Sequence, residues 1–159
     1  MKTIIIVLSA CLMLTACDKT PDSSLIGSIV KEKTASDVAK EVANYVIHHD
    51  YDKAIALSTE KPHGYEKYNG AIPVFEYAKE IQAMMAKSGK EPSVELKDIP
   101  YTLSIAEEEI TLGTKIINGV KQPDIARIIV KADAGNGRGK FFKMRLSNVD
   151  GNWRVFDFK

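Results

Sequence analysis

The sequence has few of the residues on which disulfide bonds and metal sites depend. It contains 2 cysteines and 3 histidines among 159 residues. The adjacent His48 and His49 would point about 100° apart on a helix, and there is neither an HExxH pattern nor a closely spaced cysteine pair. We therefore expect no metal site and no cofactor.

A marked excess of one charge is also absent. The chain has 22 lysines and arginines against 21 aspartates and glutamates, a formal net charge of +1. General nucleic-acid binding relies on a strong basic excess. The composition therefore argues against nucleic acid as the partner.

No apolar run is long enough to span a membrane. The longest, residues 4–14, has eleven residues and is interrupted only by Ser9, whereas a spanning helix needs about 20. Lys2 precedes the run and the small residues Thr15 and Ala16 follow it. This layout is typical of a secretory signal.

Residues 14–17, Leu-Thr-Ala-Cys, resemble the lipobox of bacterial lipoproteins, which has the form Leu-x-[Ala/Gly]-Cys. The resemblance implies cleavage before Cys17, a diacylglycerol on its thiol and a palmitate-type acyl chain on its new amine. Several acyl chains together give lasting membrane anchoring. Cys11 would leave with the leader, so no disulfide could form. The alternative is a plain secretory signal that leaves Cys17 as a free thiol.

Asp18 follows the lipobox cysteine. An aspartate at this position resembles the signal that retains enterobacterial lipoproteins in the inner membrane. The resemblance therefore favours the inner membrane over the outer membrane, with the globular part facing the periplasm in either case.

The chain divides into a leader, a tether and one domain. Cleavage after residue 16 leaves 143 residues, enough for a single domain with its own core. Residues 17–33 form the acylated cysteine and a polar tether. Residues 34–159 form the domain.

Apolar spacing predicts three helices, at about residues 34–49, 53–57 and 72–88. Thr34 and Asp37 have the spacing of a capping box at the first helix, and Asp50 or Asp52 is expected to cap the second. The following residues are expected to line one side of the third helix: Val74, Tyr77, Ile81, Met84 and Met85.

Alternation with a period of two predicts strands at residues 93–106, 109–117, 125–133, 139–148 and 152–158. The first two would be joined by a hairpin at residues 107–109. The apolar face would carry Ile110, Leu112, Thr114 and Ile116, then Ala126, Ile128, Val130 and Ala132, then Phe142, Met144 and Leu146. Helices followed by such a meander predict an α+β fold: three helices packed on a curved, cone-like antiparallel sheet of four to five strands.

Two short segments resemble a known group of proteins. Residues 45–54, Tyr-Val-Ile-His-His-Asp-Tyr-Asp-Lys-Ala, and residues 151–155, Gly-Asn-Trp-Arg-Val, are similar to segments of cystatin-like, nuclear-transport-factor-two-like bacterial lipoproteins of unknown function. The resemblance implies a cone-shaped domain. That superfamily includes isomerases and dehydratases as well as non-catalytic binding domains, so it leaves both kinds of function open.

An enzyme of this kind would use a carboxylate beside a tyrosine in the cone cavity. Asp157 is the candidate, because it alternates with Trp153 and Val155 on the last strand, and Tyr45 or Tyr101 would lie nearby. The alternative, which we favour, is that Asp157 faces solvent and pairs with a basic residue on the neighbouring strand.

A binding surface is suggested by local charge. Residues 127–159 carry eight basic and three acidic residues. The candidate docking surface consists of Arg127, Lys131, Phe141, Lys143 and Arg145. It is either a solvated outer sheet face or a docking site for an acidic protein or anionic lipid headgroups.

These patterns favour a lipid-anchored periplasmic binding or interaction protein without catalysis, which neutralises or scaffolds an envelope protein. An immunity-type role is one subclass. The alternative is a small-molecule isomerase or dehydratase-like enzyme.

Replacing the lipobox cysteine tests the anchor. In Cys17→Ser the thiol that accepts diacylglycerol is gone, so the chain should lose labelling by a fatty-acid analogue and leave the membrane fraction. Labelling and membrane fractionation of cells measure both effects. Labelling that persists in the variant would refute acylation at Cys17.

Overall fold

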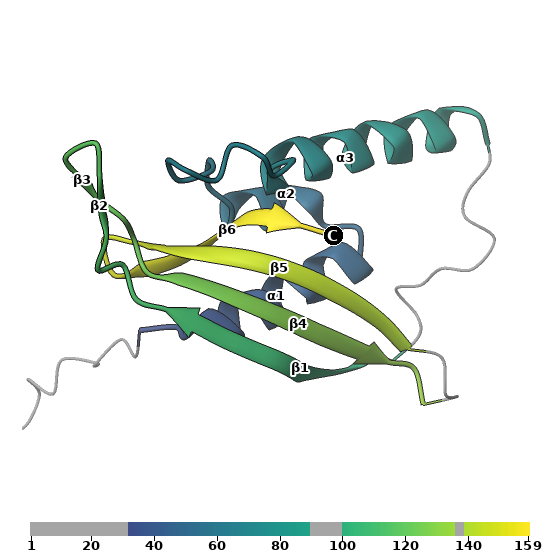
Figure 1. Ribbon diagram of the computed structural model, residues 1–159. Helices are drawn as coiled ribbons and strands as arrows, with labels where there is room; N and C mark the ends of the chain where they lie inside the picture. The colour runs from purple at the N-terminus through teal and green to yellow at the C-terminus, as the bar shows by residue number, and fades with distance from the viewer. Residues whose placement is uncertain (1–31, 90–99, 136–138) are drawn as a thin grey trace, which may run out of the picture. The chain divides into compact units, whose positions relative to one another are not determined.

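Three helices precede a sheet of four antiparallel strands in the computed structural model, which describes residues 32–89, 100–135 and 139–159 (Figure 1). The leader, Cys17, Asp18 and most of the tether lie outside these residues, as does the first half of the strand predicted to begin at residue 93. In the described part of the chain, no helix is both long and apolar enough to cross a membrane.

The first helix, α1 (Ala35–Ile47), begins as the capping box predicts. Thr34 Oγ1 accepts a hydrogen bond from the Asp37 amide at 3.2 Å, and the Asp37 carboxylate accepts one from the Thr34 amide at 3.1 Å. The helix ends two residues before the predicted end. His49 has a φ of 60°, a left-handed conformation that cannot continue a right-handed helix.

The second helix, α2 (Tyr51–Ala56), begins after Asp50, but its predicted side-chain cap is wrong. The Asp50 carboxylate makes no capping hydrogen bond. It lies 2.6 Å from the Lys53 ammonium instead, because a charged partner one turn away competes with the helix amides for its oxygens.

The third helix, α3 (Ala71–Lys87), matches its predicted range, but most of its predicted apolar side is exposed. Only Ala71 and Phe75 are buried, whereas 63% of Tyr77 and 59% of Met84 is exposed. The helix packs on α2 and on the last strand. The first turns of α3 therefore make its buried contacts with the rest of the domain.

The sheet has the strand order β1-β4-β5-β6, with every neighbouring pair antiparallel. The strands are β1 (Thr102–Thr111), β4 (Ile125–Asp133), β5 (Gly139–Val149) and β6 (Asn152–Phe158). A small ribbon of β2 (Ile116–Ile117) and β3 (Val120–Lys121) projects from the connection between β1 and β4 (Figure 1).

The hairpin predicted at residues 107–109 is wrong. One strand, β1, runs through it, and the register against β4 shifts between Ile105 and Glu107. Ala106 is the additional residue of a β-bulge. The segment has no glycine, asparagine or proline to favour a tight turn, so the strand bends at the bulge instead of reversing.

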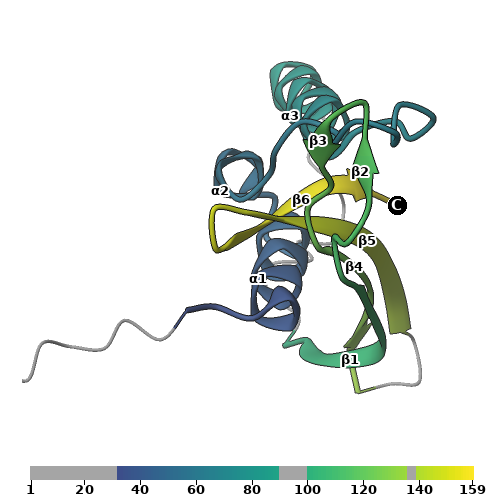
Figure 2. The same ribbon diagram turned by 60° about the vertical axis from the view of Figure 1, so that its left-hand side comes forward.

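Helix α1 lies on the concave side of the curved sheet, and the core fills the space between them (Figure 2). Fully buried members of this core include Val42, Phe75, Ile128, Val130, Met144, Leu146 and Val155. The core face predicted for β4 and β5 is confirmed: Ala126, Ile128, Val130 and Ala132 are buried, as are Met144 and Leu146, and Phe142 is half-buried.

The core face predicted for residues 109–117 is wrong. Exposed fractions are 50% for Ile110, 66% for Leu112 and 70% for Ile116. Because β1 ends at Thr111, Leu112 lies in the connection and Ile116 in the ribbon, while Ile110 is next to the end of the outermost strand.

A second β-bulge reverses the expected orientation of the end of β6. Val155 pairs with Leu146 but Asp157 pairs with Arg145, so Phe156 is an additional residue. Strict alternation would put Asp157 on the core face with Val155. The bulge turns it to the opposite face and returns Phe158 to the core, where its ring centroid lies 4.8 Å from that of Phe75.

The two sides of α3 allow a test of this packing. Phe75→Ala removes a fully buried ring and should lower the free energy of unfolding by about 3–5 kcal/mol. Tyr77→Ala is the matched control on the same helix, and its exposed ring should cost less than about 0.5 kcal/mol. Urea denaturation followed by circular dichroism measures both, and equal effects would contradict the structure.

Candidate functional site: a basic cluster around Tyr68

The five residues of the predicted docking surface lie on one face of the sheet, the face turned away from α1. In the β4–β5 register, Arg127 is opposite Arg145 and Lys131 is opposite Phe141, while Lys143 lies between them opposite Ile129. The intervening residues of both strands point into the core. We call this side of the sheet the outer face.

Most basic charge predicted for docking is neutralised within the sheet. The guanidinium of Arg127 lies 3.7 and 3.8 Å from the carboxylates of Glu107 and Glu109. The Lys131 ammonium lies 2.9 Å from Asp133. Hydrogen bonds from Lys131 and from the Gly135 amide lower the pKa of Asp133. Arg127 and Lys131 are therefore poor candidates for attracting an acidic partner.

Arg145 forms a largely buried ion pair with Asp157. Its Nη1 lies 2.6 Å from Oδ2 of Asp157, whose side chain is 1% exposed against 27% for the Arg145 side chain. The expected pairing with a basic residue on the neighbouring strand is therefore present, but the expectation that Asp157 faces solvent is wrong. Its burial follows from the segment that covers it.

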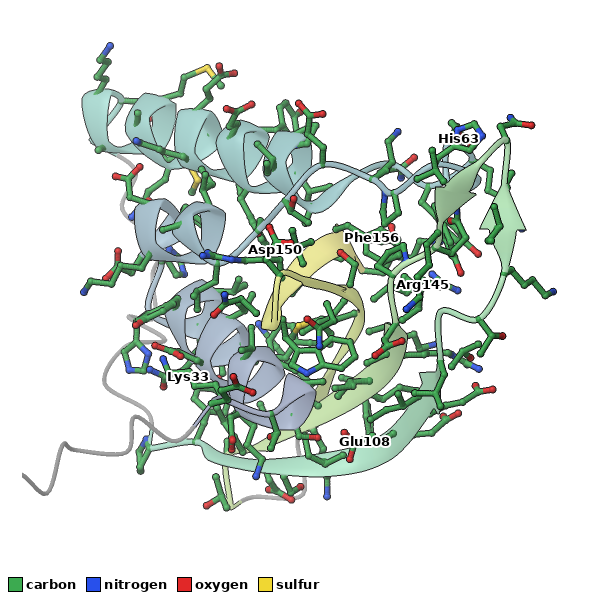
Figure 3. All side chains as sticks on the ribbon, turned by 90° about the vertical axis from the view of Figure 1, so that its left-hand side faces the viewer. Lys33, His63, Glu108, Arg145, Asp150 and Phe156 are labelled. Carbon is green, nitrogen blue, oxygen red and sulfur yellow. The ribbon has the colours of Figure 1, made fainter. Side chains whose placement is uncertain are left out.

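That cover is the connection between α2 and α3. At its start, the Thr59 amide donates to the carbonyl of Val155 at 2.9 Å and the Val155 amide donates to the carbonyl of Leu57 at 3.0 Å. Farther along, the rings of Tyr65 and Tyr68 lie 5.2 and 6.5 Å from that of Phe156, edge to face. Arg145 and Phe156 lie together on the outer face (Figure 3), and the connection shields them.

Three cationic side chains surround the ring of Tyr68. The Arg145 guanidinium lies 4.1 Å from the ring centroid, the Lys67 ammonium 5.3 Å and the Lys159 ammonium 6.0 Å. Lys143 is the strand neighbour of Lys159, since their backbones exchange hydrogen bonds of 2.8 and 2.9 Å. The Tyr68 cluster is defined here as Lys67, Tyr68, Lys143, Arg145 and Lys159.

The lysines of the Tyr68 cluster differ from Arg127 and Lys131 on the same face. Lys67, Lys143 and Lys159 are exposed, and no carboxylate of residues 32–89, 100–135 or 139–159 lies within ion-pair distance of them. Their positive charge is therefore available to a partner. The partly exposed ring of Tyr68, which lies among these lysines, adds an amphipathic contact surface.

Lys67, Tyr68 and Lys159 were not predicted from the sequence as members of a binding surface. The signal in the sequence is the run of lysines and tyrosines in residues 61–68, which by itself reads as a polar loop. Lys61 holds this run in place by donating to the carbonyl of Tyr68 at 2.9 Å. Only the fold places the run over the last two strands.

The residues proposed for catalysis in a cone cavity are separated. Asp157 lies in register with Arg145 and, through it, with Arg127 and Glu109 near the end of β1. Tyr101 precedes the start of β1, at the other end of that strand. The remaining candidate, Tyr45, is on α1 at the core side of the sheet.

Tyr45 is engaged within its own helix. Its hydroxyl donates to the carboxylate of Glu41 at 2.9 Å, and this hydrogen bond raises the pKa of Tyr45. Glu41 also lies 2.5 Å from the Lys33 ammonium, which lowers the pKa of Glu41. These contacts stabilise the start of the domain and do not approach Asp157.

In the described part of the chain, no group of three or more histidines, cysteines, aspartates and glutamates is placed so that it could hold a metal ion. An open hollow does lie at the far end of the outer face, lined by Thr102, Ser104, Lys131, Asp133 and Gly135. Its charged groups pair with each other, and none of Tyr45, Tyr101 and Asp157 lines it.

No protein-family model matches the chain, and the comparison with curated protein sequences gives no match. The chemistry of the site is therefore the basis for inferring a function.

The buried ion pair has a testable energetic signature. Arg145→Met leaves Asp157 buried without its cation and should lower the free energy of unfolding by about 3–5 kcal/mol. Arg145→Met combined with Asp157→Leu removes both charges and should recover most of that loss. Urea denaturation measures both variants. A double variant no more stable than the single one would contradict the pairing.

Proposed function

We propose that this protein is a lipid-anchored periplasmic binding domain without catalysis, which holds an acidic surface of a partner protein against the Tyr68 cluster. The observation that carries the proposal is the exposure of Lys67, Lys143 and Lys159 without carboxylate partners in the described residues. Arg127 and Lys131, elsewhere on the outer face, do have such partners.

Electrostatics and packing make this surface suitable for a protein. Four cationic side chains and one carboxylate side chain, that of Asp157, lie in and under the cluster. Complementary charge accelerates association and selects among partners. Tyr68 adds a rigid aromatic surface of the type enriched at binding hot spots. Arg145 holds this ring from below while its own charge is neutralised.

The proposal keeps the bacterial lipoprotein anchor at Cys17, with Asp18 favouring the inner membrane, and the cone-like, cystatin-like fold. The order of three helices followed by an antiparallel sheet curved around α1 supports the fold. A tethered domain searches only the nearby envelope. An envelope protein with an acidic surface, including a toxin neutralised by an immunity-type protein, fits this arrangement.

The enzyme alternative has less support. The bulge at Phe156 turns Asp157 away from the space between the sheet and α1. Fully buried apolar side chains, including Val42, Ile128 and Met144, occupy that space. A catalytic carboxylate would have to point into that space, and the register of β6 directs Asp157 to the opposite face.

Charge reversal in the Tyr68 cluster tests the binding role. Lys143→Glu combined with Lys159→Glu should weaken partner binding about tenfold or more, because two attractions become repulsions. Crosslinking in the native envelope with mass spectrometry identifies the partner, and titration of the purified pair gives the dissociation constant. Arg145 is left unchanged, since its reversal would also break the buried ion pair.

The matched control is Lys115→Glu combined with Lys140→Glu, which changes the net charge equally at exposed lysines outside the cluster. It should leave binding within about twofold of the unchanged protein. Equal loss of partner binding in both double variants would show that net charge, and not the Tyr68 cluster, governs binding, and would contradict the proposal. Binding of the full-length Cys17→Ser chain to anionic phospholipid vesicles that is lost in Lys143→Glu combined with Lys159→Glu, with no protein crosslinked through the cluster, would assign the surface to lipid and overturn the proposal.

A further inference from the structure

The two outer edges of the sheet differ in how their backbones are covered. At β6, the residues Leu57 and Thr59 hydrogen-bond to Val155 and close that edge. At the other edge, β1 pairs with β4 on one side, and no described segment pairs with its other side. The edge of β1 therefore presents amide and carbonyl groups to an additional strand.

The accessible part of this edge is the stretch after the β-bulge. Residues 107–111 keep a regular register with β4, from Ile129 to Ile125, and all five are exposed. In an antiparallel pair, alternate residues direct their amide and carbonyl groups to the neighbour and the others direct them outward. This stretch can therefore form a short ladder on its free side.

Side chains along the stretch indicate what kind of strand would fit. Glu107 and Glu109 lie on the outer face near Arg127, whereas Glu108 lies on the other face, opposite Ile128, and has no ion-pair partner among the described residues (Figure 3). Beyond them, Ile110 and Leu112 are 50% and 66% exposed. Both faces of the edge thus carry carboxylates, followed by apolar side chains.

A second copy of the chain is a poor occupant. Antiparallel pairing of two β1 strands through this stretch, centred on Glu108, would place six carboxylates within two neighbouring strands, with only the two Arg127 cations to offset them. Like charges directly opposite each other destabilise a strand pair. Charge complementarity instead requires basic side chains opposite residues 107–109.

We propose that the free edge of β1 binds an extended basic segment of a partner protein, which adds a strand to the sheet. Backbone hydrogen bonds to residues 107–111 hold the segment, lysines or arginines pair with the three glutamates, and an apolar residue packs on Ile110 and Leu112. The proposal rests on the binding role proposed above but uses the edge opposite the Tyr68 cluster.

The competing explanation is that the bulge and the glutamates only protect an exposed edge from pairing, as charges and bulges do in many sheets. The two explanations differ in one observable. Protection predicts that no extended peptide adds to β1, whereas recognition predicts that a basic one does and an acidic one does not.

The probe is a nine-residue synthetic peptide with lysine at its three central positions and valine at the others, so that lysines lie on both faces of the added strand. It is titrated into the full-length Cys17→Ser chain by nuclear magnetic resonance. We expect shifts and slowed amide exchange in alternate residues of the stretch 107–111. A peptide with glutamate in place of lysine should not bind. The lysine peptide with alternate backbone nitrogens methylated keeps its charge but loses its donors, so it should bind at least about tenfold more weakly.

Glu108→Lys is the variant of choice because Glu108 supports no ion pair in the described residues. The dissociation constant for the lysine peptide should rise about fivefold or more. Glu80→Lys, an equal charge change at an exposed position on α3, should leave it unchanged. Absence of binding, or equal binding of the methylated peptide, would overturn the proposal.

The result is independent of the Tyr68 cluster. Lys143→Glu combined with Lys159→Glu should leave binding of the lysine peptide at the β1 edge intact, because Lys143 lies on β5 and Lys159 directly follows β6. Failure at the β1 edge would therefore leave the proposed binding role standing. Failure of the envelope experiment alone would leave the edge site standing.

Discussion

The additional residue in β6, Phe156, decides which side of the sheet carries a charge. In a regular strand Asp157 would share the core face with Val155, where burying a carboxylate without a cation is costly. The bulge instead places Asp157 opposite Arg145 and returns Phe158 to the core against Phe75. One inserted residue thus pairs the Asp157 carboxylate with a cation on one face and lets Phe158 pack into the core on the other.

The buried pair in turn depends on the connection between α2 and α3. This segment is tied to β6 at Val155 and covers the outer face with Tyr65 and Tyr68. Because Arg145 lies against Tyr68, the position of the ring follows from the position of the ion pair. The exposed lysines around that ring are therefore held on a framework that extends into the core.

Local patterns sufficed for the elements whose determinants lie within a few residues. The capping box at Thr34 and the alternation in β4 and β5 predicted a helix start and a core face correctly. The bulges at Ala106 and Phe156 could not be predicted in this way, since a register shift is a property of two strands and has no signature in one. The Tyr68 cluster could not be predicted for a related reason. Lys67 and Lys159 are far apart in sequence and are brought to the same ring only by the fold of the bulged strand.

The near-neutral composition conceals a segregation of charge that the strand order creates. On the outer face, Glu107 and Glu109 of β1 share the single cation of Arg127, so one negative charge is left over at the β1 side, while unpaired lysines gather at the β6 side. A partner approaching the outer face therefore meets opposite charges at its two sides. Such an arrangement favours one orientation of a partner whose own charges are divided, because the reversed orientation would bring like charges together at both sides.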